Sequence, residues 1–438
     1  MPTLPPSPLR STAAAPVVNT KVALAVVTTI FFMWGFLTCL NDILIPHLKS
    51  VFQLNFAQAM LVQFTFFGAY FLMSLPAGRL VAHVGYKQGI VIGLVIAGIG
   101  AIGFWPAAEL RVYGAFLTAL FVLATGITVL QVAANPYVAL LGPERTSSSR
   151  LTLAQAMNSL GTTLEPYFGG VLILSNTVKT TDQIAVLPDA ERAAYFAHEA
   201  SAVQGPYLGL GIFLFLLAVF VFLFRLPRLT ETTEKAEKAD AGSHTWADVL
   251  RHRHLVLGVL GIFFYVGAEV AVGSLMVNYF SLPEIGGITE AQASKYLMAY
   301  WFLAMVGRFA GSALMVNLSP RKLLAIFATV NIALLVTTMS STGMPAVYSL
   351  IAVGLFNSIM FPTIFALSIE GLGPLTSKGS SLLIMAIVGG AIVPYLQGQL
   401  ADRIGLHHSF VLPLLCYGYI IFYGLFGARR GAAAAGAA

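Results

Sequence analysis

The chain has 438 residues, of which 58% are hydrophobic and 10% are charged, and its mean hydropathy is +0.83. A soluble globular domain carries about 25% charged residues, so this composition excludes a soluble protein and indicates one that crosses a membrane repeatedly. The formal net charge of +6 does not indicate nucleic-acid binding, because the basic residues lie in short segments between apolar runs.

The chain begins with a segment rich in Pro and Ser that lacks the apolar core of a signal peptide, and we predict a disordered tail over residues 1–21. Apolar runs of about 20 residues follow, each long enough for a transmembrane helix. They predict an all-α membrane protein with twelve transmembrane helices. The predicted spans are 22–47, 57–82, 87–106, 112–141, 151–174, 205–226, 253–281, 291–317, 321–341, 344–370, 379–400 and 408–428.

The loops between these spans predict the orientation of the chain. Twelve spans place both termini on the same side of the membrane, and most of the Lys and Arg residues fall on that side. The positive-inside rule assigns the side with more Lys and Arg to the cytoplasm. We therefore expect both termini in the cytoplasm.

The first span carries a carboxylate in apolar surroundings. The stretch "FFMWGFLTCLNDILIPHL", from Phe31 to Leu48, contains Asn41 and Asp42. Ionisable residues inside a span are costly and usually face a water-filled cavity or an ion path. Asp42 is therefore the first candidate for binding a transported cation.

Two further carboxylates lie deep in predicted spans, Glu165 in the fifth and Glu269 in the seventh. We find no Lys or Arg at a comparable depth, and we expect these acids to lack a fixed cationic partner. Such a carboxylate takes up a proton or binds a cation, which favours a cation-coupled machine. The competing interpretation is a buried acid that only ties helices together.

A charged connection after the sixth span separates two similar halves. The segments "NPYVALLGPERTSSSRLTLAQAMNSLGTTLEPYFGG" and "FPTIFALSIEGLGPLTSKGSSLLIMAIVGGAIVPYLQG" share the order Pro, Gly-Pro, Ser/Thr-rich turn, Gly-containing apolar run and Pro-Tyr. Parallel repeats of this kind occur in two-half transporters, which bind their substrate between the halves. We predict six-helix halves at 22–226 and 253–428, a cytoplasmic linker at 227–252 and a tail at 429–438.

Amide side chains and aromatic rings accompany the acids in several spans. Amides pair with neighbouring hydroxyl groups, and aromatic rings cover the apolar face of a sugar ring, although ordinary packing is an alternative for each ring. Gln155 and Asn158 are three residues apart and share a helix face. The candidate sugar-binding residues are Asn41, Gln131, Asn135, Gln155, Asn158, Tyr265, Asn278, Asn357 and Phe361.

The turns that face the cytoplasm carry a second set of charges. Arg79 lies in "GRLVAHVGYKQG" between the second and third spans, and Arg308 in "GRFAG" is its counterpart in the second half. Glu144 and Glu370 follow the fourth and tenth spans and are the acidic partners that we expect for these arginines. We predict that these four residues gate the cytoplasmic side.

Several segments together resemble one known family. They are "LNDILIPHLKSVFQLNFAQAMLVQFTFFGAYFLMSLPAGRL", "AANPYVALLGPE", "RLTLAQAMNSLG", "YVGAEVAVGSLMVNY" and "FPTIFALSIEGLG". These segments are similar to the fucose–galactose–glucose:cation symporter family, and the similarity extends over residues 22–428. The resemblance implies the major facilitator fold, alternating access and a bacterial inner-membrane sugar symporter in which Asp42, in "LND", carries the coupling chemistry.

The chain departs from the family's fucose permease at two positions. Gln131 stands where that protein has a second coupling acid, and Glu269, in "GAEVA", stands where it has Gln; both features resemble the glucose/galactose branch. Carboxylate and amide oxygens are ligands for a hard cation. We therefore expect a sodium site framed by Asp42, Gln131 and Glu269, with protonation of Asp42 as the alternative.

These observations predict a cation-coupled symporter for a glucose- or galactose-like hexose, with fucose or an amino sugar as other possible substrates and Na⁺ or H⁺ as the coupling ion. We expect a monomer in the lipid bilayer, with no other cofactor and no nucleic-acid partner. The alternatives are an uncoupled facilitator or exporter of small solutes, a polytopic membrane enzyme and a sugar sensor. The absence of catalytic motifs argues against the enzyme.

Overall fold

The computed structural model describes residues 22–36, 56–172, 188, 191, 195, 204–224 and 245–429, without the side chains of 56–60, 165–172, 290, 291 and 294. Every regular element in these ranges is a helix. Ten of the helices are long and apolar enough to cross a membrane. The prediction of an all-α membrane protein is therefore confirmed, while the predicted tail 1–21 lies outside the described residues.

One group of helices comes from the first half of the chain. Its first helix is Val22–Phe36, and the others, here called with it the N-terminal group, are α2 (Phe56–Val84), α3 (Tyr86–Leu110), α4 (Tyr113–Leu140), α5 (Ser147–Leu172) and α8 (Gln204–Leu223). Small residues bring α3 and α4 together, since a Cβ on Gly126 would lie 2.2 Å from the backbone nitrogen of Ala97. Close backbone approach through small residues is typical of membrane helix pairs.

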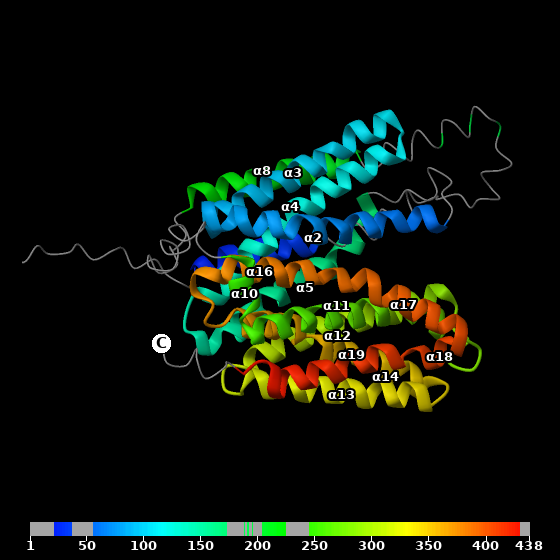
Figure 1. Ribbon diagram of the computed structural model, residues 1–438. Helices are drawn as coiled ribbons and strands as arrows, with labels where there is room; N and C mark the ends of the chain where they lie inside the picture. The colour runs from blue at the N-terminus through cyan, green and yellow to red at the C-terminus, as the bar shows by residue number, and fades with distance from the viewer. Residues whose placement is uncertain are drawn as a thin grey trace, which may run out of the picture.

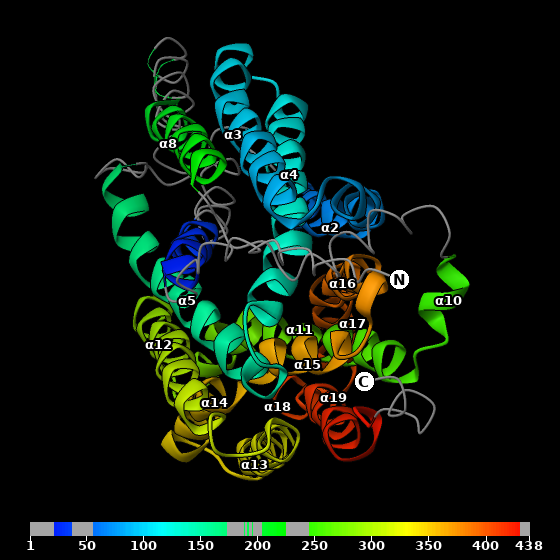
Figure 2. The ribbon, with the colours of Figure 1, turned by 90° about the vertical axis from the view of Figure 1, so that its left-hand side faces the viewer.

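The second group follows the short linker helix α10 (Trp246–Leu250), which begins with the capping box between Thr245 and Asp248 that the sequence pattern indicates. We call it the C-terminal group. It consists of α11 (Arg253–Phe280), α12 (Glu290–Leu314), α13 (Pro320–Ser340), α14 (Met344–Asn357), α15 (Met360–Ile369), α16 (Thr376–Met385), α17 (Gly389–Ile404), α18 (Leu406–Ser409) and α19 (Val411–Phe422), which continues into the π-helix η4 (Tyr423–Gly427). Figures 1 and 2 show the two groups lying side by side.

The groups meet chiefly along two helix pairs, α5 with α12 and α2 with α16, and α5 also contacts α15 while α4 contacts α16. At the first pair, Ser149 Oγ donates to the carbonyl oxygen of Ser312 at 2.7 Å, and Ser312 Oγ donates to that of Ser149 at 2.9 Å. Beside the second, Ser380 Oγ donates to the carbonyl oxygen of Val132 at 2.9 Å. All these contacts lie where α5 and α16 begin and α12 ends, which we call the closed end.

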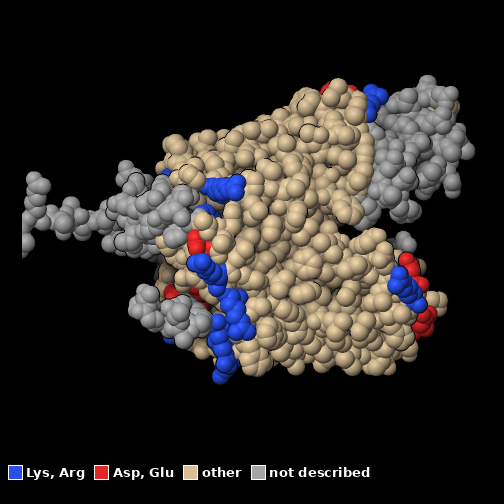
Figure 3. Space-filling view, viewed as in Figure 1, with Lys and Arg blue, Asp and Glu red and all other residues tan. Residues whose placement is uncertain are grey.

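The two ends of the molecule differ in shape. Figure 3 shows the groups in contact at the closed end and separated by a notch at the opposite end. Lys and Arg side chains form a band at the closed end in the same view. The fold therefore holds two helix groups together at one end of a shared interface.

Candidate functional site

The centre of the C-terminal group contains a buried ion pair. Arg308 on α12 approaches Glu269 on α11 with 3.7 Å between Nη2 and Oε1, and both side chains are largely buried. Tyr265, one turn before Glu269 on α11, donates from its hydroxyl to the same Oε1 at 2.8 Å. The expectation that Glu269 lacks a cationic partner is therefore wrong, because α12 brings an arginine to it from another span.

Arg308 also reaches the other helix group. Its Nη1 donates to the hydroxyl of Ser159 on α5, and its Nε donates to the carbonyl oxygen of Ser358 at 3.3 Å. Ser159 in turn donates to the carbonyl oxygen of Gln155 at 3.1 Å. A continuous set of polar contacts thus runs from Glu269 through Arg308 to α5, across the interface between the groups.

The motif "GRFAG" explains how Arg308 comes to lie there. A Cβ on Gly307 would lie 2.4 Å from the carbonyl oxygen of Leu355, and one on Gly311 would lie 2.2 Å from a side-chain carbon of Ile359. Two glycines four residues apart let α12 pack closely on α14 and the turn after it. This packing fixes Arg308 beside Ser358, inside the protein rather than in a cytoplasmic turn, and the acid beside it is Glu269 rather than Glu144 or Glu370.

Asn357, at the end of α14, is the centre of a hydrogen-bond network. Its Oδ1 accepts from Asn331 Nδ2 at 2.8 Å and from the Tyr417 hydroxyl at 2.7 Å, and its Nδ2 donates to the Tyr300 hydroxyl at 2.8 Å. Its carbonyl oxygen lies 3.1 Å from the Tyr265 hydroxyl. We expected Asn357 to bind a sugar, but in this structure its amide is occupied by side chains from three other helices.

The buried amides of the N-terminal group are placed differently. Gln131 and Asn135 are one turn apart on α4 and Gln155 lies on α5, and all three are almost completely buried. Gln131 Nε2 donates to the Tyr70 hydroxyl at 2.6 Å, yet its Oε1 has no hydrogen-bond partner in the described part of the chain. Neither amide atom of Asn135 has one there, and neither does Nε2 of Gln155. Buried polar atoms are nearly always paired, so these atoms are candidates for binding a ligand.

Asn158 ties α5 to the first helix. Its Nδ2 donates to the carbonyl oxygen of Phe31 at 3.0 Å, and a Cβ on Gly35 would lie 2.0 Å from the carbonyl oxygen of Asn158. The residues that follow this helix include Asn41 and Asp42, which lie outside the described residues. Our predictions for Asn41 and Asp42 therefore stay predictions.

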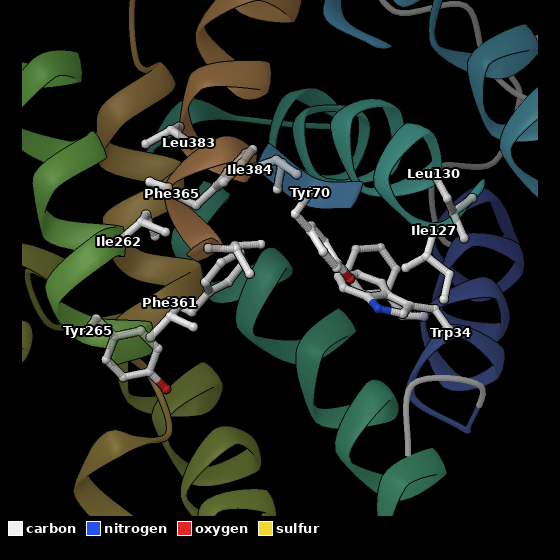
Figure 4. Packing of buried hydrophobic residues seen from close by; sticks show 14 of the residues in the cluster. Trp34, Tyr70, Ile127, Leu130, Ile262, Tyr265, Phe361, Phe365, Leu383 and Ile384 are labelled. Atoms are coloured by element: carbon white, nitrogen blue, oxygen red, sulfur yellow. The ribbon is translucent and has the colours of Figure 1, made fainter. Parts of the chain in front are cut away.

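Aromatic rings lie on both sides of the interface. Figure 4 shows Trp34 of the first helix beside Tyr70 of α2, with Phe361 of α15 and Tyr265 of α11 across from them in the C-terminal group. Tyr265 is fully buried and Phe361 is 9% exposed. The rings of Trp34 and Phe361 therefore lie in opposite groups.

The other predicted residues lie away from this centre. Asn278 is exposed near the end of α11, and Glu165 is part of α5 with a side chain outside the described set. Arg79 lies over the ring of Trp246 in the linker helix, 5.9 Å from its centroid. Glu144 is exposed in the turn before α5.

Glu370 follows α15 at the closed end and acts on Arg321 rather than on Arg308. Burial raises the pKa of Glu370 to about 7, although the positive charge of Arg321 opposes this rise. The backbone carbonyl of Glu370 is also 3.0 Å from Nε2 of His254 on α11.

Sequence reasoning missed several residues of these networks. Asn331 was detectable, because it is an amide inside the apolar run "IFATVNIALLV". Ser159, Tyr300 and Tyr417 carry no comparable signal, since serines and tyrosines are frequent in these spans. Their roles follow only from the packing of α5, α12 and α19.

Comparison with known proteins decides the family. The model of the Major Facilitator Superfamily matches residues 23–382. The chain belongs to the Major Facilitator Superfamily. It is therefore a membrane transporter and not an enzyme, and the predicted major facilitator fold is confirmed.

Relatives within the superfamily extend over nearly the whole chain. A glucose/galactose transporter of Brucella abortus is 54% identical over 411 residues, which cover 94% of this chain and 95% of that protein. An L-fucose-proton symporter of Escherichia coli is 36% identical over 407 residues, covering 92% and 93%. The resemblance stated from sequence motifs is therefore confirmed.

Solved structures agree with this assignment. The crystal structure of a variant of the E. coli fucose:proton symporter FucP has a TM-score of 0.87 and 35% identity, covering 94% of this chain and 100% of that chain. A structure of FucP described as being in the outward conformation gives the same values.

Proposed function

We propose that this chain is a cation-coupled monosaccharide symporter that works by alternating access. The observation that carries the proposal is the set of contacts from Glu269 through Arg308 to Ser159. When ionised, Glu269 attracts Arg308, which bridges the two helix groups. When a proton or a cation neutralises Glu269, this attraction is lost. The binding of an ion at Glu269 and the relative position of the two helix groups are thereby linked through Glu269 and Arg308.

The magnitude of this link suits a transport cycle. Two opposite unit charges about 4 Å apart attract each other by about 4 kcal/mol at an effective dielectric constant of about 20. Shifting a two-state equilibrium from 1:99 to 99:1 takes about 5.5 kcal/mol. Neutralising Glu269 therefore changes the hold on Arg308 by an amount comparable to a full change of state.

The substrate is a hexose of the glucose or galactose type, with fucose or an amino sugar as alternatives. The names of the relatives support this class, because they transport glucose and galactose or fucose. The unpaired atoms of Gln131, Asn135 and Gln155 are available to hydroxyl groups, and Asp42 and Glu165 are kept as coupling candidates. A polyhydroxylated ring supplies the donors and acceptors that these amides lack.

The coupling ion is Na⁺ or H⁺, and a different observation favours each of the two ions. The unpaired Gln131 Oε1 is an oxygen ligand that suits the sodium site predicted with Asp42 and Glu269. Against sodium at Glu269, its Oε1 already faces the guanidinium of Arg308, which is itself a cation. The E. coli relative is a proton symporter, and protonation of Glu269 needs no additional space.

We further propose that the protein lies in the cell inner membrane as a monomer, with both termini in the cytoplasm. The halves are 22–226 and 253–428, joined by the linker 227–252. In this orientation the closed end faces the cytoplasm, where Arg79 lies in the last turns of α2, Glu144 precedes α5 and Glu370 follows α15. The notch between the groups then opens to the outside, which corresponds to the outward conformation named for the FucP structure.

Uptake by purified protein in proteoliposomes tests the function. Labelled glucose, galactose, fucose and N-acetylglucosamine are offered with an inward sodium gradient or an inward proton gradient, each imposed separately. We expect one gradient to drive accumulation above the outside concentration. Uptake that only equilibrates would show a facilitator, and binding without counterflow would show a sensor.

Variants of the ion pair test the coupling. Glu269→Gln is expected to abolish accumulation while sugar counterflow persists, and Arg308→Ala is expected to lower the transport rate more than sugar affinity. Glu284→Gln, an exposed acid after α11, is the matched control and keeps full accumulation. Full accumulation by Glu269→Gln would remove this carboxylate from the mechanism.

A further inference from the structure

A groove lies on the outer face of the C-terminal group, between α13 and the last helix. Its volume is about 500 Å³, and it lies away from the interface with the N-terminal group, as the positions of α13 and α19 in Figure 2 show. The residues that line it are Lys322, Ala325, Ile326, Thr329, Val330, Ile421 and Leu425. In a protein that spans a membrane, this face is turned toward lipid.

The helical repeat explains why these residues share one groove. Lys322, Ala325, Ile326, Thr329 and Val330 stand at positions i, i+3, i+4, i+7 and i+8 of α13 and therefore form one stripe. Ile421 and Leu425 are likewise one turn apart on the facing helix. Both residues that line the opposite wall of the groove are apolar.

Small residues bring the two walls together at the closed end. A Cβ on Gly424 would lie 3.4 Å from Cβ of Ala325 and 3.0 Å from the carbonyl oxygen of Arg321. Gly424 belongs to the π-helix η4, and π-turns are frequent at functional sites. The backbone of η4 therefore lies close to the first turns of α13 at one end of the groove.

The charges at this end have one predominant sign. Arg321 Nη2 donates to the carbonyl oxygen of Leu425 at 3.0 Å, and Arg429 Nε donates to the same oxygen at 3.1 Å. Lys322 is exposed and has no ion-pair partner in the described part of the chain. Arg321 is also within electrostatic reach of the carboxyl group of Glu370. Three cations, Arg321, Lys322 and Arg429, thus lie at this end of the groove, and Glu370 is the acid beside Arg321.

We propose that the groove binds one anionic phospholipid, with an acyl chain along α13 and the phosphate at Lys322. The aliphatic stem of Lys322 lies along the apolar wall while its ammonium group reaches the level of the headgroups. Basic pockets between helices on the cytoplasmic side bind anionic headgroups, and each cation near the surface strengthens binding about fivefold. A neutral lipid fills the same groove but leaves this charge unmatched.

The test measures lipid binding to the full-length purified protein. Native mass spectrometry after titration with phosphatidylglycerol or phosphatidylcholine gives the two affinities, and inorganic phosphate is the third probe. We expect phosphatidylglycerol to bind at least about fivefold more tightly than phosphatidylcholine, and phosphate alone not to compete at millimolar concentration.

Two variants separate the charge from the groove. Lys322→Ala is expected to reduce the preference for phosphatidylglycerol about fivefold, and Thr329→Phe is expected to block binding of either lipid by filling the groove. Arg145→Ala removes an exposed cation from the turn before α5 and serves as the control without an effect. Sugar binding by each variant verifies that it is folded.

Other results would overturn the proposal. Equal affinity for the two lipids would show a groove that takes acyl chains without regard to charge. Unchanged phosphatidylglycerol binding in both Lys322→Ala and Thr329→Phe would place the lipid elsewhere, and competition by free phosphate would show an anion site without an acyl chain. None of these results bears on sugar transport.

Discussion

The two helix groups use their buried amides in opposite ways. In the C-terminal group, Asn357 is fully buried and binds side chains from three other helices. In the N-terminal group, Asn135 is equally buried, but neither of its amide atoms has a partner within the described residues. An unpaired buried polar group costs about 1–3 kcal/mol. We therefore propose that Asn135 binds a ligand, whereas the observed partners of Asn357 hold helices together.

The position of Asn357 explains its structural role. α14 ends at Asn357 and α15 begins at Met360, so the tenth span is interrupted there. Its side-chain partners Tyr300, Asn331 and Tyr417 come from α12, α13 and α19, so four helices are held at the interruption. The contrast between the amides of the two groups is not complete, because Oδ1 of Asn331 and Oε1 of Gln397, both in the C-terminal group, are also unpaired among the described residues.

The largest expected effect concerns the stability of this network. Asn357→Leu leaves three polar partners unpaired, and a hydrogen bond in a membrane protein contributes about 0.6 kcal/mol in addition to the desolvation of the groups left behind. We expect the free energy of unfolding to fall by about 2–4 kcal/mol. Unfolding in detergent measures this, and Asn331→Leu, which removes one of the three bonds, is expected to lose less.

The affinity of Asn357→Leu for sugar separates the two roles. If Asn357 holds helices only, sugar affinity measured by calorimetric titration well below the unfolding temperature stays close to that of the parent protein. A large loss of affinity without a loss of stability would place Asn357 in the sugar site and would contradict the proposed difference between the amides of the two helix groups.

The second prediction concerns Asn135. Asn135→Leu removes two unpaired polar atoms at similar volume, so we expect unchanged or higher stability together with a loss of sugar affinity of about 1–3 kcal/mol, which is about 5- to 150-fold. Calorimetric titration and thermal unfolding of the same preparation measure both quantities. Lower stability with unchanged affinity would show that Asn135 has a structural partner.

The third prediction concerns Gln131, which is intermediate between the fully paired Asn357 and the unpaired Asn135. One of its amide atoms binds the Tyr70 hydroxyl and the other is unpaired among the described residues. Gln131→Leu is expected to lower the free energy of unfolding by about 0.6 kcal/mol and also to weaken sugar or sodium binding. Tyr70→Phe removes the same hydrogen bond, together with the one between the Tyr70 hydroxyl and Trp34, but leaves the unpaired oxygen in place, and is expected to lower stability more than sugar affinity.

Much of the fold was predictable from the sequence because it depends on local patterns. Apolar runs predict helices by length and composition, and the repeated Ser/Thr-rich turns predict two similar halves. The capping box of the linker helix was also readable, since it needs only Thr245 and Asp248 at a fixed spacing. These features do not depend on which helices become neighbours.

The pairing of the polar residues could not be predicted from the sequence, because it depends on which helices become neighbours. "GRFAG" resembles a cytoplasmic turn motif, yet α12 continues to Leu314, so Arg308 lies about 9 Å inside the end of the helix at a rise of about 1.5 Å per residue. Its contact with Glu269 depends on the relative position of α11 and α12. The same holds for Asn357 and Asn135, which are both amides inside apolar runs and differ only in what packs against them.

The smallest expected effect concerns a carboxyl group of the C-terminal group that titrates near neutral pH. Burial raises the pKa of Glu370 from 4.5 to about 7, against the influence of Arg321. Between these two values the folded protein binds more protons than the unfolded chain, so the free energy of unfolding falls as the pH rises from about 4.5 to about 7.

Glu370→Gln removes this titration, and we expect a flatter dependence of the unfolding temperature on pH between about 5 and about 7, with sugar affinity unchanged. Glu284→Gln, at an exposed position, is expected to keep the slope of the parent protein. Because Glu370 lies at the closed end and not among the unpaired amides, a change in sugar affinity in Glu370→Gln would mean that the C-terminal group contributes to ligand binding from its closed end. An unchanged slope would show that Glu370 stays ionised throughout this pH range, with Arg321 as the stronger influence.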